Sequence, residues 1–249
     1  TGLGTPTIAT DATTKGYVDG VTGTKDYDET GIADGMTPYY DNASGTIKWR
    51  SANKQLFTAS GTFTAPAGVT TVYLSGTAAG GGGGGGTVPM GDGSGAGGGS
   101  GACITKLPYT VVPGNSYTVT INAAGTGGTA SNNGVSGGTT VFDTITLAGG
   151  AGGAEGSIGA ASVGGDQGGK AYDLGVAGGF GYTSGDGANG NTTHTAGGGG
   201  GNIFGKGGVG GTAANGSSSK IGYGGGGGGG GGISAVGGGG AKGMMLVEW

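Results

Sequence analysis

The sequence predicts a mostly β protein: a short N-terminal segment with a small helix and a hairpin, then a small β-sandwich extended by a bundle of polyglycine-II helices. Three observations predict this fold. Of the 75 glycines, 65 lie at residue 76 or later, and the longest run has nine in succession at 224–232. Only six prolines are present and no Gly-X-Y period exists, which excludes collagen. Apolar and polar residues alternate between the glycine runs, as in strands.

The glycine runs can be ordered only if neighbouring segments take up their backbone N–H and C=O groups. Each interior Gly costs a helix about 1 kcal/mol relative to Ala, and Gly also weakens a strand. An extended helix of the polyproline-II type has three residues per turn and no internal hydrogen bonds, so its backbone groups point outward. Because glycine has no Cβ, such helices can approach closely. We therefore expect the glycines to form a scaffold that carries the rarer residues.

The first 54 residues have an ordinary composition. Asp11 is a candidate N-cap for a short helix that ends near Gly20. The segment GMTPYYDNASGTIKW, residues 35–49, predicts a hairpin with its turn at 41–45. These elements form the first of two expected domains, 1–54 and 55–249.

The second domain is expected to contain about seven strands. The strand candidates lie at 55–66, 69–79, 104–112, 116–124, 139–142, 144–148 and 243–249. The apolar positions of these strands predict a core of Phe63, Val72, Leu74, Leu107, Val111, Tyr117, Val119, Ile121, Val141, Ile145, Leu147, Met245 and Val247.

The order of strands and glycine runs predicts two ends for this domain. Strands and their tight turns, such as Pro113–Asn115, lie at one end, the base. The glycine helices extend from the strands, and the loops between them meet at the far end, the tip. The expected tip loops are 87–94, 129–133, 154–163, 182–195 and 212–221, and residues 233–236 are a further candidate.

Composition and charge exclude several classes of function. A net charge of −4, with only 10 Lys and Arg residues, does not favour nucleic-acid binding. No apolar run approaches the roughly 20 residues that a membrane-spanning helix needs, and no signal peptide is recognised at Thr1. Cys103 is the only cysteine, so neither an intramolecular disulfide nor a thiolate metal cluster is expected.

No enzymatic activity, metal or cofactor is expected. The only histidine is His194, and a zinc site needs three or four nitrogen or sulfur ligands. The oxygen-rich segment GDGANGN, 185–191, is interpreted as a plain turn rather than a calcium site. A glycan-cleaving site needs paired carboxylates. The candidate carboxylates are instead spread over separate loops: Asp92, Asp143, Glu155, Asp166, Asp173 and Asp186.

Several segments resemble phage tail fibres. DATTKGYVD, 11–19, is similar to a segment of trimeric fibre shafts, and FTASGTFTAPAGVTTVYLSGTAAGGGGGGG, 57–86, resembles the start of a glycine-rich tail-fibre tip domain. The later glycine runs, separated by varied loops, resemble the polyglycine-II sandwich of T-even-type phage adhesins. The resemblance covers roughly residues 9–249. It implies that 1–54 is a fibre shaft or trimerisation segment and that 55–249 is the tip domain.

The resemblance also implies a function. It predicts a non-enzymatic adhesin that binds a bacterial surface receptor, either an outer-membrane protein or a glycan. The adhesin would be extracellular, at the fibre tip of a virion or on a phage-like fibre of a bacterium. In the T-even arrangement the adhesin is a separate protein that caps the fibre. Here shaft-like and tip-like segments share one chain, so a homotrimer is expected.

The expected receptor contacts lie in the tip loops, because loops on a rigid scaffold are where binding residues usually occur. Two alternatives to an adhesin remain open: a structural or ice-binding polyglycine-II protein, and a glycan depolymerase. The candidate contact residues are Val88, Met90, Asn132, Asn133, Ile158, Phe180, Tyr182, Asn191, His194 and Ser218.

Overall fold

The computed structural model divides the chain into two units, Thr1–Lys54 and Gln55–Trp249, and each is considered by itself. Strands and extended segments make up the described part, and no helix occurs in it. The helix expected between Asp11 and Gly20 lies outside the described residues. The structure describes residues 37–41, 46–50, 53–87, 93–157, 180–182, 196–212 and 214–249.

In the first unit, β1 (Thr37–Asp41) and β2 (Thr46–Arg50) form a two-stranded antiparallel sheet. Thr37 lies opposite Arg50 and Asp41 lies opposite Thr46. These two strands correspond to the hairpin that the sequence predicts at 35–49.

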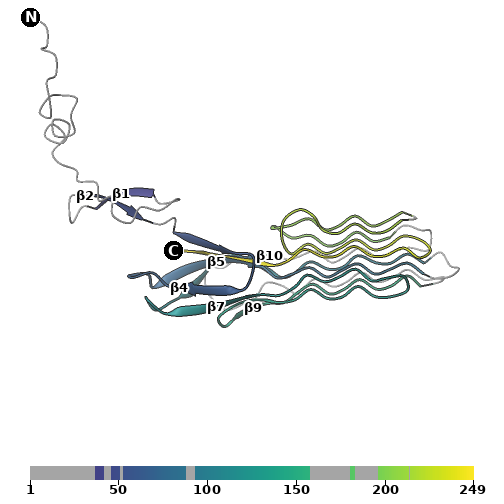
Figure 1. Cartoon of the computed structure of the whole chain (residues 1–249), viewed down its shortest axis with the longest axis horizontal. Coiled ribbons are helices and arrows are strands. Elements are labelled where there is room, and N and C mark those ends of the chain that lie inside the picture. The colour runs from purple at the N-terminus through teal and green to yellow at the C-terminus, as the bar shows by residue number, and fades with distance from the viewer. Residues whose placement is uncertain are drawn as a thin grey trace, which may run out of the picture. The chain divides into compact units, whose positions relative to one another are not determined.

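The second unit contains two sheets (Figure 1). The larger sheet has five strands in the order β10-β6-β5-β11-β3, and its β10–β6, β6–β5 and β5–β11 pairs are antiparallel. The last strand of the chain therefore lies inside the sheet, between β5 and β3. The strands of this sheet are β3 (Lys54–Phe57), β5 (Thr71–Thr77), β6 (Cys103–Thr110), β10 (Phe180–Tyr182) and β11 (Met244–Glu248).

The smaller sheet has four strands in the order β4-β7-β8-β9, and every neighbouring pair is antiparallel. The β8–β9 pair is a tight hairpin, in which Asp143 takes a φ of 51°. The strands are β4 (Gly61–Thr64), β7 (Ser116–Ile121), β8 (Thr140–Phe142) and β9 (Ile145–Leu147).

One hydrophobic core joins the two sheets. Leu74 and Met245 from the larger sheet and Phe63 and Leu147 from the smaller sheet are fully buried in it. Most of the core predicted from the sequence is buried, and Tyr117 and Ile121 pack partly buried against it. The residues confirmed as buried are Phe63, Val72, Leu74, Leu107, Val111, Val119, Ile145, Leu147, Met245 and Val247.

The prediction for Val141 is wrong by one residue. Phe142 is fully buried in the core, whereas Val141 is only half-buried and is not part of the core cluster. In β8 the side chains alternate between the two faces, and Phe142 lies opposite the buried Val119. The larger aromatic side chain therefore takes the core position.

Extended glycine segments continue from the strands and lie side by side as a bundle (Figure 1). Strand β5 runs directly into residues 78–87, and residues 93–102 lead into β6. The segment at 78–87 is buried throughout.

The central segment, Gly80–Gly86, is held by hydrogen bonds that repeat every three residues. Its N–H groups donate to three neighbouring segments in turn, over N···O distances of 2.8–2.9 Å. This repeat is that of an extended helix with three residues per turn, in which successive N–H groups point a third of a turn apart. The N–H groups of residues 80, 83 and 86 donate to the segment 235–241, and those of residues 81 and 84 donate to 96–99. The N–H groups of residues 82 and 85 donate to 132–135.

The carbonyl groups of the central segment accept from three further segments. These are residues 125–131, 153–156 and 227–230, again with a repeat of three. Neighbours on the donor and acceptor sides thus surround the central segment. Because every contact is made by backbone groups, the middle of the bundle needs no hydrophobic side chain.

Glycine is required in this segment by the closeness of its neighbours. A Cβ built on any residue of Gly80–Gly86 would lie closer than 3.0 Å to a backbone oxygen of another segment. Left-handed backbone conformation is not the reason, because none of these residues has a positive φ. The described glycines with positive φ are Gly68, Gly114, Gly222, Gly224 and Gly232.

Candidate binding surfaces

The end of the bundle far from the sheets, which we call the distal end, is where several segments reverse direction (Figure 1). Strand β5 ends at Thr77, and the segment that follows it reaches the distal end at Thr87. The Ser131 N–H donates to the Gly86 carbonyl at 2.7 Å, and the Ser234 N–H donates to the Thr87 carbonyl at 3.0 Å. The chain reversals around Ser131 and Ser234 therefore lie at the distal end.

Asn132 and Asn133 are both exposed near this end, as the sequence predicts, but their side chains also support the bundle. The Asn132 amide nitrogen donates to the Thr129 hydroxyl at 3.0 Å and to the Ala130 carbonyl at 2.9 Å, which closes the turn. The Asn133 side-chain oxygen accepts from the Glu155 N–H at 2.8 Å. Each asparagine therefore has a structural role.

The reversal at 232–235 presents an exposed apolar side chain, Ile233, which is not among the contact residues predicted from the sequence. Ile233 is 54% exposed, between Gly232 and Ser234, which have φ values of 90° and 60°. The sequence suggests a loop at 233–236, but it does not indicate whether this loop lies at the base or at the tip, because the glycines on either side carry no pattern. Hydrogen bonding of Ser234 to Thr87 now places this loop at the distal end.

Phe180 and Tyr182 do not lie in a tip loop, and their predicted placement there is wrong. Both belong to β10, which pairs with β6 so that Phe180 lies opposite Thr105 and Tyr182 lies opposite Cys103. Two aromatic residues in a short segment favour a strand, and β6 offers an unpaired edge on that side.

The remaining candidates from the long tip loops are outside the part of the chain that the structure describes. These are Val88, Met90, Ile158, Asn191 and His194. Their flanking residues are described: Thr87 and Gly93 are hydrogen-bonded to each other at the distal end, where the Thr87 N–H donates to the Gly93 carbonyl at 3.2 Å.

Ser218 is exposed, but it lies along the side of the bundle rather than in a tip loop. The Gly231 N–H donates to the Ala214 carbonyl, and the Lys206 N–H donates to the Ile221 carbonyl, so the segment from 214 to 221 runs back along the bundle. The expected loop at 212–221 is therefore shorter than predicted.

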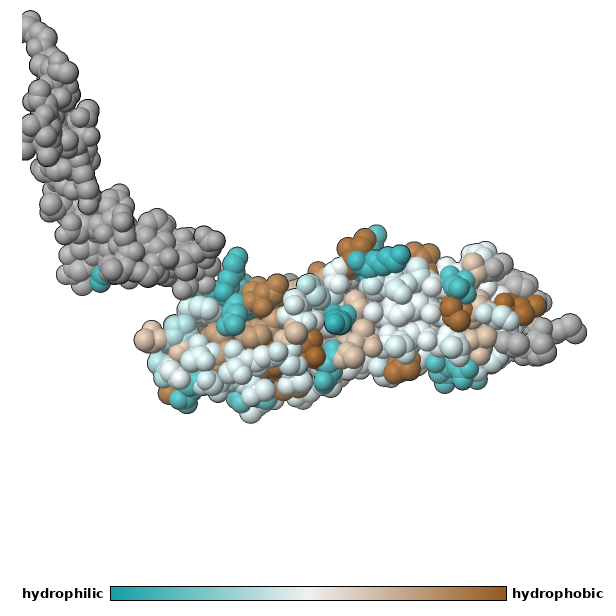
Figure 2. All heavy atoms as spheres, viewed as in Figure 1, coloured by the Kyte–Doolittle hydropathy of each residue, from teal (hydrophilic) through white to brown (hydrophobic). Residues whose placement is uncertain are grey.

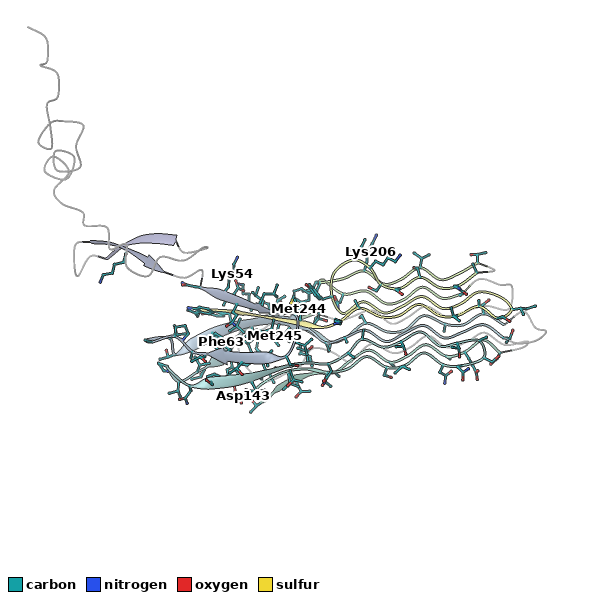
Figure 3. The ribbon with its side chains drawn as sticks, viewed as in Figure 1. Lys54, Phe63, Asp143, Lys206, Met244 and Met245 are labelled. Carbon is teal, nitrogen blue, oxygen red and sulfur yellow. The ribbon has the colours of Figure 1, made fainter. Side chains whose placement is uncertain are left out.

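Ser218 lines a shallow groove of about 230 Å³, which we call the lateral groove. Figure 2 shows hydrophilic and hydrophobic side chains gathered at one edge of the bundle, and Figure 3 shows Lys206 there with its side chain on the outer side. Two lysines and two exposed aliphatic side chains contribute to this groove. Its lining residues are Lys206, Gly207, Gly208, Val209, Ser217, Ser218, Lys220 and Ile221.

Polar side chains along the edges of the bundle accept hydrogen bonds from backbone N–H groups that have no backbone acceptor among the described residues. They occur in pairs three residues apart, which matches the repeat of the glycine segments. The acceptors are Asn133 for Glu155 N, Ser136 for Gly152 N, Asn215 for Val236 N and Ser218 for Gly239 N, over 2.8–3.3 Å.

The chemistry of the described residues offers no metal-binding group of three or more His, Cys, Asp or Glu side chains. Cys103 is fully buried, and burial raises the pKa of its thiol, so the reactive thiolate is disfavoured. No helix in the described ranges is long and apolar enough to cross a membrane.

Two antiparallel sheets with a glycine bundle at their end define a glycine-rich β protein. A family model described as a glycine-rich domain matches residues 58–249, which is most of the chain. The chain therefore belongs to the glycine-rich domain family. No curated protein matches the sequence.

Proposed function

We propose that the described part of the second unit is a small β-sandwich extended by a polyglycine-II bundle, and that it acts as a rigid support for binding loops. The three-residue repeat of hydrogen bonds around Gly80–Gly86 supports the bundle assignment. The single core shared by the two sheets supports the sandwich.

The proposed function is that of an adhesin at the tip of a phage or phage-like fibre, which binds a bacterial surface receptor. The observation that supports it most is that several chain reversals lie together at the distal end of the bundle, whose segments are joined by backbone hydrogen bonds. A rigid scaffold lowers the entropy that its loops lose on binding, and such loops are usual sites of recognition.

The homotrimeric state and the extracellular location are parts of the same proposal. Their support is the resemblance of residues 11–19 to a trimeric fibre shaft and of residues 57–86 to a fibre tip domain. The receptor is proposed to be an outer-membrane protein or a surface glycan.

Two exposed isoleucines provide a matched test of binding at the distal end. Ile233 is 54% exposed at that end, and Ile203 is 50% exposed in the loop at the other end, where Asn202 bonds to Thr77 at the end of β5. With a bacterial strain that the unaltered chain binds, Ile233→Ser is expected to weaken cell binding about tenfold, since losing a buried interface contact costs about 1–2 kcal/mol. Ile203→Ser is expected to leave it unchanged.

A second variant tests the binding loop that the sequence predicts at 182–195. Replacing residues 183–195 by a Gly-Ser linker of equal length is expected to abolish cell binding while the melting temperature and oligomeric state stay the same. Binding of the unaltered chain to no strain of a broad panel would contradict the proposal, as would equal effects of Ile233→Ser and Ile203→Ser.

A further inference from the structure

The lateral groove is formed where two neighbouring segments of the bundle meet. The Lys206 N–H donates to the Ile221 carbonyl at 3.0 Å, and the Val209 N–H donates to the Ser217 hydroxyl at 2.7 Å. These bonds fix the register of the two segments, so the lysines and aliphatic side chains of both line one groove. Its position along the side of the bundle separates it from the distal end.

The groove is positively charged, although the chain as a whole has a net charge of −4. Lys206 and Lys220 are both exposed, and no carboxylate is among the lining residues. In the described part of the chain neither ammonium group has an ion-pair partner, whereas the Lys106 ammonium pairs with Glu248 at 2.5 Å. The groove can therefore offer both charges to an anion.

Apolar surface lies next to these charges. Val209 is 73% exposed and Ile221 is 67% exposed, the two highest values among the large hydrophobic side chains of the described residues. Exposed apolar surface beside polar groups is typical of an interaction site. The Ser218 hydroxyl borders the same groove and can hydrogen-bond a ligand hydroxyl.

We propose that the lateral groove binds an anionic saccharide unit. A sugar ring has a C–H face that fits against Val209 and Ile221, a rim of hydroxyl groups, and, in an acidic sugar, a charge for the lysines. The volume of about 230 Å³ is below the roughly 300 Å³ of the smallest pockets for drug-sized ligands, which suits one sugar residue of a chain. This site does not depend on receptor binding at the distal end.

The test uses the full chain, the double variant Lys206→Gln/Lys220→Gln, and the control Lys54→Gln/Lys242→Gln, which makes the same change in charge at exposed lysines elsewhere. Binding of oligogalacturonate at low salt is measured by calorimetry. The groove variant is expected to lose at least tenfold in affinity and the control less than twofold. Methyl chemical shifts of Val209 and Ile221 are expected to move on titration of the unaltered chain only.

Further ligands distinguish whether a carboxylate or a phosphate of the saccharide supplies the negative charge. A phosphorylated mannan that binds with the same dependence on Lys206 and Lys220 would extend the site to phosphate as the source. Methyl-esterified oligogalacturonate, which lacks the charge, is expected to bind at least tenfold more weakly. Equal binding of the ester, equal binding by the groove variant, or tighter binding of polyglutamate than of either saccharide would overturn the proposal.

A result at this groove can be told apart from a result at the distal end. Lys206→Gln/Lys220→Gln is expected to keep the contribution of Ile233 to cell binding, because the two surfaces share no described residue. Loss of saccharide binding with an intact Ile233 effect supports the groove, whatever the receptor at the distal end.

Discussion

At the scale of single residues, a glycine of the bundle matters for the atom that it lacks. An added Cβ at Gly83 would lie closer than 3.0 Å to the Gly228 carbonyl oxygen, whereas at Gly198 the nearest atom would be 3.6 Å away, an ordinary contact. Backbone atoms cannot move aside as a flexible side chain can. The same substitution is therefore expected to destabilise the protein at Gly83 but not at Gly198.

Gly83→Ala is expected to destabilise the protein by about 3 kcal/mol, because it overpacks a region that cannot yield. That corresponds to a fall in melting temperature of roughly 6–12 °C. Gly198→Ala is expected to change the melting temperature little or to raise it slightly, since Ala reduces the entropy of the unfolded chain. Thermal unfolding followed by circular dichroism measures both, and equal shifts would contradict the role of close packing.

Asn202 shows a different use of a single side chain. Its amide nitrogen donates to the Thr77 hydroxyl at 2.9 Å and to the Gly101 carbonyl at 3.3 Å, and its oxygen accepts from the N–H groups of Phe204 and Gly205. One half-buried residue thus closes the loop at 202–205 and ties it to the end of β5.

Asn202→Ala is expected to lower the free energy of unfolding by about 2–3 kcal/mol, for the loss of several bonds of about 0.5–1.5 kcal/mol each. Asn215→Ala is the matched control, because the exposed Asn215 side chain accepts a single bond from the described residues, from the Val236 N–H at 2.9 Å. Its expected cost is below about 1 kcal/mol. Urea unfolding distinguishes the two, and an Asn202 variant as stable as the Asn215 variant would contradict this role.

At the scale of elements, the bundle is organised by a repeat of three that extends to its edge. Asn133 and Ser136 accept from Glu155 and Gly152, so both donors and acceptors are three residues apart. Side chains at the edge thus take the place of a further glycine segment.

Asn133→Ala is expected to speed amide exchange at Glu155 by about five- to tenfold, for a net bond of about 1 kcal/mol. Asn133→Asp retains an acceptor at the same position and is expected to keep the protection. Amide exchange measured by NMR tests this pair. Unchanged exchange in Asn133→Ala would show that the edge bond contributes nothing.

The strands could be predicted from the sequence, but the partners of the glycine segments could not. Alternation of apolar and polar residues identifies strands such as 71–77 and 116–121, and most of the core follows from it. A glycine run has no such alternation, so nothing in 224–232 indicates which segments lie beside it. Only the few residues other than glycine can indicate how neighbouring segments are aligned. The pairs of polar residues three positions apart are such an indication.

The candidate site was predictable only in part, for the same reason. Asn132 and Asn133 lie at the distal end as expected, because a turn of small and polar residues interrupts the glycines there. Lys206 and Lys220 lie 14 residues apart in the sequence and meet only through the pairing of two glycine-rich segments, so the lateral groove could not be anticipated.

At the scale of the whole second unit, the sheets and the bundle share the same chain segments. Strand β5 continues into the central segment Gly80–Gly86. Strand β11 follows the segment 235–241, whose Ala235, Gly238 and Ala241 carbonyls accept hydrogen bonds from the central segment. The central segment has no side chains to bury and is surrounded by backbone. Its alignment therefore depends on strands whose order is fixed by the hydrophobic core.

This dependence predicts that the two parts unfold together. Leu74→Ala removes a fully buried side chain from β5 and is expected to destabilise the core by about 2–5 kcal/mol. If the unit is cooperative, amide protection of Gly80–Gly86 falls by the same factor as the equilibrium constant for folding, although no atom of the bundle has changed. Amide exchange and aromatic fluorescence on the same variant compare the two. Protection that persists in the bundle after the aromatic core has unfolded would mean that the glycine segments hold one another without the sheets.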